Sequence, residues 1–582
     1  MYRRSPYSSP GPGGMPVRFP RLIAKFRPQA LMEFVIVLLA LTSAFSVWAI
    51  RLFIQLGSLI TPIALFHDWP EEIWLLKWTG RGLYAGHFPV VTHLLNAPGA
   101  ANMLWSTANY FWSALIFPIT RLNMIAGYDL AMALSVISAG FVVYLLARRW
   151  GCGKYSATAA GALFELSPYM TGQAINNHIV LLGLFGGLMI LLAVDELVFQ
   201  HGGWDSWRIL SVAVLGFDIQ LYTSEEVLLI LVLMVLLVGF FSVVRFRDDV
   251  FRCINVFSRT QWVVSAFAIG IPTLFMYHAQ YFSYGALHGP FVPPLQYVSN
   301  LASVIVPGPN FFLTNSWTIS RFQSLNPSPS ETTLYWGIPA VIFAFWRYRN
   351  GATKDRFLIL VALMATCFCL SSPWYLLQHL PLVQFMVPSR ISLIVDLALC
   401  LLWARWFSTF KPNIAYARKW IAAGLIILPW LPALAPVVKP HIPTYFITYK
   451  SKTQPTLLIL PYALNGITAT PMLWQAAANY QFKMPEGYYT ARSYLSKEGF
   501  NVGPVLTTAT RTLFALSLGV RLKHEATRSE ICVYLKQHEV TEVILGPTVH
   551  YDLLYNYIKY VFRSSGKSTQ GVITWPANSC RS

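Results

Sequence analysis

Long runs of apolar residues, separated by short polar stretches, recur along the first three quarters of the chain. A helix needs about 18 to 20 such residues to cross the hydrocarbon core of a membrane. On this criterion we predict eleven spans, near residues 32–53, 128–147, 156–173, 178–199, 207–224, 226–244, 261–280, 334–346, 357–372, 390–404 and 419–437. Eleven spans would leave the two termini on opposite sides of the membrane.

The apolar run at 103–120 would break this parity if it also crossed. We therefore expect an interfacial or re-entrant element there, on the outer face. The long segments 54–127 and 281–333 then form outer loops. The organisation that follows is a disordered basic tail at 1–31, a multi-spanning domain at 32–437, and a further segment at 438–582.

The pattern changes character after residue 437. Short apolar runs typical of buried strands now alternate with amphipathic stretches of helical period. We predict strands at 456–461, 542–545 and 572–575 and helices at 529–538 and 549–561. The fold class expected is an α-helical polytopic membrane protein followed by a small soluble α/β domain.

Composition supports the membrane assignment. Charged residues make up 12% of the 582-residue chain and apolar residues 55%, whereas soluble domains are about 25% charged. The net charge of +19 would suggest nucleic acid as a partner in a soluble protein, so it must first be divided between the two sides of the membrane.

That division is uneven. The loops assigned to the cytoplasm and the N-terminal tail hold 22 Lys and Arg residues, whereas the opposite side holds six before residue 438. Cytoplasmic loops of membrane proteins carry such an excess. The bias predicts a cytoplasmic N-terminus and an extracytoplasmic C-terminal domain, and it removes the nucleic-acid interpretation.

Polar and ionisable side chains are concentrated in the first outer loop. Acids, histidines, cations and aromatic rings gather between Phe66 and Trp105, a mixture that suits a wet pocket at a membrane surface. The alternative is an ordinary external loop whose Trp and Tyr rings form an interfacial belt.

Asp68 is the candidate general base, because a carboxylate there could take a proton from an acceptor hydroxyl. Its position before Trp69-Pro70 equally suits an N-cap of a helix at 70–85. His178 and Arg390, each at the outer end of a span, are candidate phosphate ligands. The alternatives are an interfacial histidine and an arginine that anchors lipid headgroups.

Other ionisable groups assigned to the outer side could also contact substrate, since charges beside spans are costly and tend to be functional. Glu331 shares this side without an assigned role. The remaining candidates are His67, Glu71, Lys77, Arg81, Glu225, Glu226 and Arg321.

The order of these features resembles the GT-C superfamily of membrane glycosyltransferases, particularly the many-spanning bacterial members that end in a periplasmic domain. The stretches that carry the resemblance are "HDWPEEIWLLKWTGRGLYAGHFPVVTHLLNAPGAANMLW", "GALFELSPYMTGQAINNH", "IQLYTSEEV", "ETTLYWGIP", "PLVQFMVPSRIS" and "LLILPYALNGITATPMLWQAAANYQFKMPEGYY".

The resemblance implies an enzyme of the bacterial inner membrane that transfers a sugar from a polyprenyl-phosphate donor to an extracytoplasmic glycan, lipid or protein. An acid of the first outer loop acts as base in such enzymes, which maps onto Asp68, and inversion would follow from a single displacement. His67 stands where related sequences more often have Gly.

The resemblance leaves metal dependence open. Some members bind a divalent ion through outer-loop acids, whereas those that use lipid monophosphate donors often need none. The sequence contains no compact ligand set that requires one. A different class of function would be a flippase or assembly factor that holds lipid-linked cell-envelope glycans without catalysis.

Two of the seven cysteines, Cys532 and Cys580, fall in the segment placed outside the membrane. Thiols in an oxidising compartment tend to pair, so a disulfide between them is one expectation. The other is a buried free Cys532 and a frayed terminus that carries Cys580.

Overall fold

The computed structural model describes residues 28–580 except for short gaps. These gaps are residues 56, 61–67, 107, 201–203, 237–238, 240–255, 284–293, 327, 330, 381–382, 384–385, 411–415, 492–500 and 503–505. His67 and residues 1–27 of the predicted tail lie outside the described residues.

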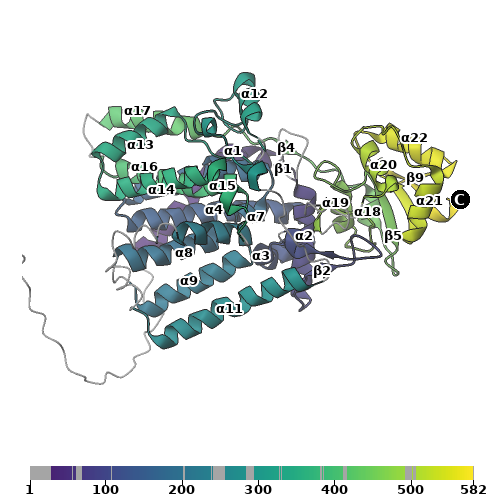
Figure 1. Ribbon diagram of the computed structural model, residues 1–582, viewed down its shortest axis with the longest axis horizontal. Coiled ribbons are helices and arrows are strands. Elements are labelled where there is room, and N and C mark those ends of the chain that lie inside the picture. The colour runs from purple at the N-terminus through teal and green to yellow at the C-terminus, as the bar shows by residue number, and fades with distance from the viewer. Residues whose placement is uncertain are drawn as a thin grey trace, which may run out of the picture.

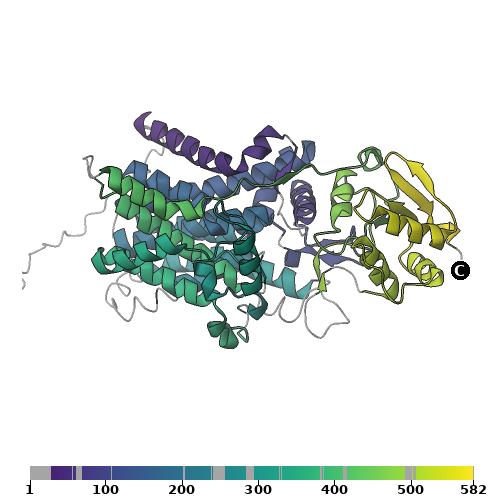
Figure 2. The same cartoon turned by 90° about the horizontal axis from the view of Figure 1, so that it is seen from above.

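A block of side-by-side helices forms the larger part of the molecule (Figures 1 and 2). Each of the eleven predicted spans overlaps at least one helix of this block. The helices are α1 (Pro28–Ile54), α4 (Met124–Arg149), α5 (Lys154–Glu165), α6 (Pro168–Ile175), α7 (Ile179–Leu182), α8 (Phe185–Asp195), α9 (Ser206–Leu221), a helix at 225–236, α11 (Arg259–Phe282), α13 (Ile338–Asn350), α14 (Thr353–Cys369), α15 (Ser371–Leu377), α16 (Ser392–Phe407) and α17 (Tyr416–Ile427).

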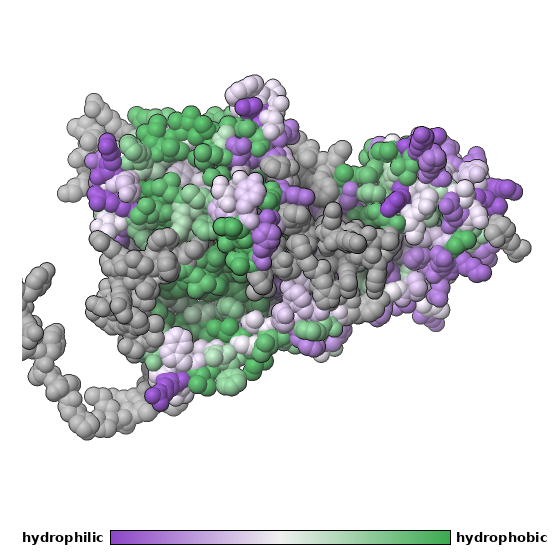
Figure 3. Space-filling view, viewed as in Figure 1, coloured by the Kyte–Doolittle hydropathy of each residue, from purple (hydrophilic) through white to green (hydrophobic). Residues whose placement is uncertain are grey.

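Four helical segments among the described residues are long and apolar enough to cross a membrane: Leu31–Ile54, Met124–Arg149, Ile179–Val198, which includes α7 and α8, and Arg259–Phe282. A bent pair, α14 with α15, makes a fifth. Apolar side chains cover much of the face of the block seen in Figure 3, whereas hydrophilic residues predominate on the C-terminal part. Exposed apolar helices of this length are suited to lipid contact. The chain is thus a multi-pass membrane protein.

Two predicted spans are not continuous helices. The 156–173 segment breaks after α5, where Ser167 caps α6 and Pro168 occupies its first turn, since proline cannot continue the preceding helix. The 178–199 segment breaks at Gly183, where an added Cβ would collide with the side chain of Thr223. Close packing at this position leaves no room for a side chain larger than that of glycine.

Ion pairs gather at the end of the block that is farther from the C-terminal part. Arg149 binds Asp195, with 2.8 Å between Nε and Oδ2, and Arg405 binds Asp355, with 2.7 Å between Nε and Oδ1. Arg405 also donates to the carbonyl of Trp150. These contacts join the ends of α4, α8, α14 and α16, which the sequence assigned to one side of the membrane.

The C-terminal part is an α/β unit with its own hydrophobic core. Its four-stranded sheet has the order β5-β8-β10-β9, in which β5 and β8 are parallel and the other pairs antiparallel. The strands are β5 (Thr456–Leu460), β8 (Val540–Leu545), β9 (Lys567–Thr569) and β10 (Val572–Pro576), and the helices that accompany them are α18 (Thr444–Thr448), α19 (Thr470–Ala477), α20 (Thr508–Ser517), α21 (Arg528–Gln537) and α22 (Tyr551–Phe562).

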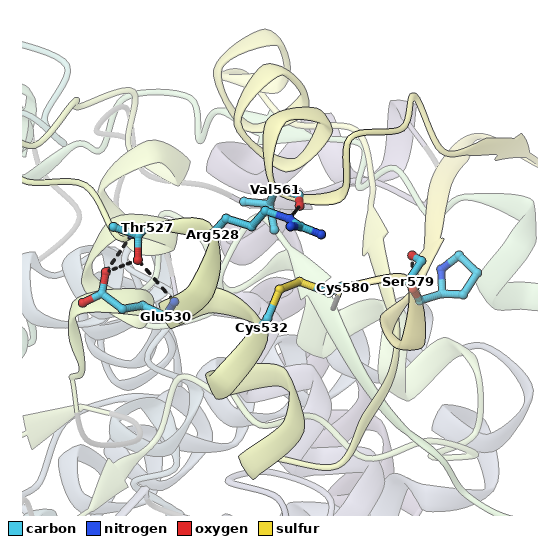
Figure 4. The surroundings of a disulfide bond; sticks show 8 residues. Thr527, Arg528, Glu530, Cys532, Val561, Ser579 and Cys580 are labelled. Carbon is cyan, nitrogen blue, oxygen red and sulfur yellow. Dashed lines mark hydrogen bonds between the residues drawn. A yellow bond between two sulfur atoms is a disulfide. The ribbon is translucent and has the colours of Figure 1, made fainter. Parts of the chain in front are cut away.

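A disulfide joins Cys532 of α21 to Cys580, with 5.4 Å between the Cα atoms (Figure 4). The bond fastens the last described residue of the chain to a helix of the α/β unit. It closes a loop across 48 positions of sequence.

The first loop of the block lies against the C-terminal unit. Its main helix, α2 (Trp69–Tyr84), is followed by the hairpin β2 (Val91–Thr92) and β3 (Ala101–Asn102). The run at 103–120 contains the 3-10 turn η1 (Met103–Ser106) and most of α3 (Tyr110–Leu122). Neither is long enough to span a membrane. We call the end of the block that faces this loop the α2 end.

Candidate active site

A cavity of about 930 Å³ opens at the α2 end. Its lining comes from the first turn of α2, the starts of α7 and the 225–236 helix, the last turns of α11, the residues before α13 and α16, and the C-terminal unit. Six residues predicted from the sequence line it: Asp68, Glu71, His178, Glu225, Glu226 and Arg390.

Asp68 stands at the N-cap of α2, but its side chain makes no capping hydrogen bond. Instead its Oδ1 accepts a hydrogen bond from the hydroxyl of Tyr488 at 2.8 Å, and its Oδ2 lies 3.0 Å from Nε2 of His178. Capping alone therefore does not explain this carboxylate. Its two oxygens face the cavity groups.

His178 immediately precedes the span that begins at Ile179. Asn177 before it adopts φ 67°, a left-handed conformation that asparagine tolerates. Nδ1 of His178 lies 2.6 Å from Oε1 of Gln173. Because an amide oxygen only accepts, Nδ1 carries a proton that it donates to Gln173.

The other ring nitrogen of His178 faces two carboxylates, Asp68 at 3.0 Å and Glu331 at 3.8 Å. Burial favours the neutral imidazole, but the negative charges of Glu331 and Asp68 outweigh it and raise the pKa of His178 above its ordinary value. The protonated ring, which donates from both nitrogens, is the form that this geometry favours.

Arg390 is held by two glutamates. Its Nε and Nη2 donate to Glu331 at 3.0 and 2.9 Å, and its Nη1 donates to Glu226. Its side chain is only 15% exposed, so it faces the cavity acids and not a lipid surface. Burial opposes ionisation of Glu331, yet Arg390 and His178 lower its pKa below the ordinary value.

The remaining acids of the cavity have weaker partners. Glu225 accepts from the side-chain amide of Gln280 at 3.0 Å. Burial, with the charge of Asp68 nearby, raises the pKa values of Glu71 and Glu72 well above their ordinary value. Burial therefore favours the neutral forms of Glu71 and Glu72, whereas Asp68, Glu226 and Glu331 each have polar partners at both carboxylate oxygens.

Lys77 and Arg81, which the sequence analysis also proposed as substrate contacts, do not line this cavity. Nζ of Lys77 donates to the carbonyl of Ala476 at 2.8 Å, and Arg81 donates to the carbonyl of Asn479 at 2.9 Å. Lys77 thus binds a carbonyl in the last turn of α19, and Arg81 binds a carbonyl just after that helix. The negative end of the helix dipole attracts positive charge.

Arg321 is exposed on the short helix α12 (Ser316–Leu325) and does not line the cavity. Tyr488 and Gln173, by contrast, contact Asp68 and His178 but are not among the predicted site residues. No local pattern links Tyr488 to Asp68, which is 420 positions away in sequence, whereas Gln173 is five positions from His178.

The described residues contain no group of three or more His, Cys, Asp or Glu side chains with the geometry to hold a metal ion. Asp68, Glu226 and Glu331 are instead directed at His178 or Arg390. This arrangement of the described side chains does not fit a metal ion.

Comparison with known proteins shows which solved structures have a similar fold. No protein-family model matches the sequence, and no curated protein matches it. Among solved structures, the mycobacterial arabinofuranosyltransferase AftD superposes with a TM-score of 0.54 at 15% identity over 95% of this chain. The archaeal oligosaccharyltransferase AglB from Archaeoglobus fulgidus gives 0.49 at 11% identity, covering 89% of this chain and 69% of its own. ArnT from Cupriavidus metallidurans gives 0.43 at 12%, covering 94% and 97%.

The likeness to AftD confirms the fold that the sequence resemblance predicted: this chain has a GT-C superfamily fold. The match spans 40% of the length of AftD. At 15% identity the likeness concerns the fold alone, so substrate and reaction have to be argued from the cavity.

Proposed function

We propose that this chain is a membrane glycosyltransferase that transfers a sugar from a polyprenyl-phosphate-linked donor to a hydroxyl of an extracytoplasmic glycan, lipid or protein. The observation that carries the proposal is the pair Asp68 and His178, held in a cavity at one end of a GT-C fold. A carboxylate beside an imidazolium suits proton removal next to an anionic leaving group.

In the proposed reaction Asp68 accepts the proton of the acceptor hydroxyl. His178 and Tyr488 each lie within hydrogen-bonding distance of one oxygen of Asp68, and a carboxylate can accept about four bonds in all. The acceptor oxygen attacks the anomeric carbon, and the bond to the phosphate oxygen breaks with its electron pair. One such displacement inverts the anomeric carbon.

Positive charge for the phosphate comes from Arg390 and His178. Among the described lining residues Arg390 is the sole Lys or Arg. Its two glutamates compete with a phosphate for the same N–H donors, so donor binding has to displace or share one of them. Glu226 makes a single contact to the guanidinium, whereas Glu331 makes two, so Glu226 is the partner we expect to move.

The cavity continues along apolar side chains that suit a prenyl chain. Phe217 and Leu221 of α9 and Leu228, Leu229 and Val232 of the 225–236 helix line it. A cavity with polar groups at one end and hydrocarbon at the other fits a lipid-linked sugar better than a free nucleotide sugar.

The proposed topology keeps eleven spans in a bacterial inner membrane, with a cytoplasmic N-terminus and a soluble extracytoplasmic C-terminal domain. Two observations support it. The Arg149 and Arg405 ion pairs lie at one end of the block and the cavity at the other, and the Cys532–Cys580 bond suits an oxidising compartment.

The test is transfer of labelled sugar from a panel of polyprenyl-phosphate sugars to membrane acceptors by the purified chain. We expect Asp68→Asn to lower transfer by about 10²- to 10⁴-fold, the usual contribution of a general base, without loss of lipid-donor binding. Asp205→Asn is a matched control, because Asp205 caps α9 with its side chain at the opposite end of the block.

The outcomes separate the two function classes. No transfer by the wild-type chain over a broad panel would overturn the glycosyltransferase proposal. Full activity of Asp68→Asn would remove the proposed base. Donor binding with no transfer would instead favour the flippase or assembly-factor alternative.

A further inference from the structure

The segment 483–490 of the C-terminal unit contributes Tyr488 and Thr490 to the lining of the cavity. It is fastened to the unit by backbone hydrogen bonds. The amide of Lys483 donates to Pro455 at 2.9 Å, and the amide of Gly487 donates to Ala463 at 3.0 Å. The segment thus moves with the α/β sheet.

The same segment is fastened to the first loop of the helical block. The amide of Met484 donates to Leu94 at 2.8 Å, and the amide of Ala97 donates back to Met484 at 3.0 Å. The amide of Thr490 donates to Oγ of Ser106 at 2.7 Å. Backbone pairing on both sides leaves the residues between these points little freedom.

Tyr488 lies between those attachment points and is half-buried. Its amide contacts Sδ of Met472 at 3.3 Å, and its hydroxyl donates to Oδ1 of Asp68 at 2.8 Å. The ring lines the cavity. A hydroxyl carried by a segment that is attached at both ends has a defined position relative to the carboxylate.

We propose that Tyr488 is a positioning residue for Asp68, so that the C-terminal unit forms part of the catalytic centre and does not merely cover it. The inference rests on the proposed function. His178 and Tyr488 hold the two oxygens of Asp68 from different parts of the chain, and together they fix the plane of the carboxylate. Without the Tyr488 hydroxyl, Asp68 is held at one oxygen and its plane can rotate.

The variant Tyr488→Phe removes the hydroxyl and keeps the ring that lines the cavity. We expect kcat to fall about ten- to a hundredfold, the usual effect of one hydrogen bond to a charged group, and KM for the donor to stay near the wild-type value. A merely structural hydrogen bond would leave kcat unchanged.

Tyr445→Phe is the matched control. The Tyr445 hydroxyl also donates to a carboxylate, Glu542 at 3.2 Å, within the C-terminal unit and away from the cavity. This variant should keep wild-type kcat and KM. Equal losses of kcat in the two variants would attribute the effect to the stability of the unit and overturn the positioning role.

A second readout needs no substrate. Carbodiimide modification of Asp68, followed by peptide mass spectrometry on the full-length chain, reports how firmly that carboxylate is held. We expect faster modification in Tyr488→Phe than in the wild type or Tyr445→Phe. Unchanged modification would overturn the inference even if transfer is observed, whereas absence of transfer by the wild type would overturn only the proposed function.

Discussion

Arg390 offers the sharpest test of the electrostatics of the cavity. Its side chain is 15% exposed, and the partners Glu226 and Glu331 are 16% and 11% exposed. The substitution Arg390→Met keeps much of the volume and removes the charge. Two largely buried carboxylates would then share a site with no guanidinium to compensate them.

Removal of one partner from a buried ion pair costs about 3–5 kcal/mol, because the remaining charge stays desolvated and unpaired. We expect a destabilisation of this size for Arg390→Met. The triple variant Arg390→Met, Glu226→Gln, Glu331→Gln removes the stranded charges as well and should recover most of the loss.

Thermal unfolding in detergent can be followed with a thiol-reactive dye, since Cys152, Cys369 and Cys400 are buried and become reactive on unfolding. Membrane proteins commonly unfold irreversibly, so midpoints are compared at one scan rate. A wild-type midpoint for Arg390→Met, or a lower midpoint for the triple variant than for the single one, would refute the reasoning.

Two further predictions concern the contact of α2 with the C-terminal unit and the disulfide of that unit. Burial lowers the pKa of Lys77 to about 8. The folded state therefore binds fewer protons than the unfolded chain between about pH 8 and 10.5, so its stability should rise with pH over that range. Lys77→Met should abolish this rise in a series of thermal midpoints. A midpoint series that is parallel for both proteins would contradict this. Replacement of Cys532 and Cys580 by Ser should destabilise the unit by about 3–4 kcal/mol in the chain-entropy model; labelling of both thiols in denatured, unreduced wild-type protein would show that the bond is absent.

The sequence predicted the regular elements well where one periodicity held throughout. The strand expected at 456–461 is β5 (Thr456–Leu460), and the helix expected at 529–538 is α21 (Arg528–Gln537). A hydropathy window cannot register the break at Gly183, because glycine is compatible with an apolar run. The close approach of Thr223, which excludes a side chain at position 183, is a tertiary contact.

The candidate site could be predicted only in part. Span ends placed Asp68, His178 and Arg390 on one side, and the structure brings all three to one cavity. Lys77 and Arg81 shared that side too, but they are four residues apart and so lie on one face of α2. That face packs on α19, a partner roughly 400 positions away that no local pattern identifies.

The contacts of α2 have a consequence for the order of events during biosynthesis. Trp74 donates to Oε1 of Gln475 at 2.7 Å, and the hydroxyl of Tyr480 donates to the carbonyl of Trp74. A ribosome adds about 5–20 residues per second, so α2 emerges tens of seconds before these partners exist. During that interval the indole of Trp74 lacks its contacts with Gln475 and Tyr480, and every chain truncated before Gln475 carries the first loop without this partner. The part of the polypeptide that is synthesised last therefore completes a site whose first residue, Asp68, is synthesised early.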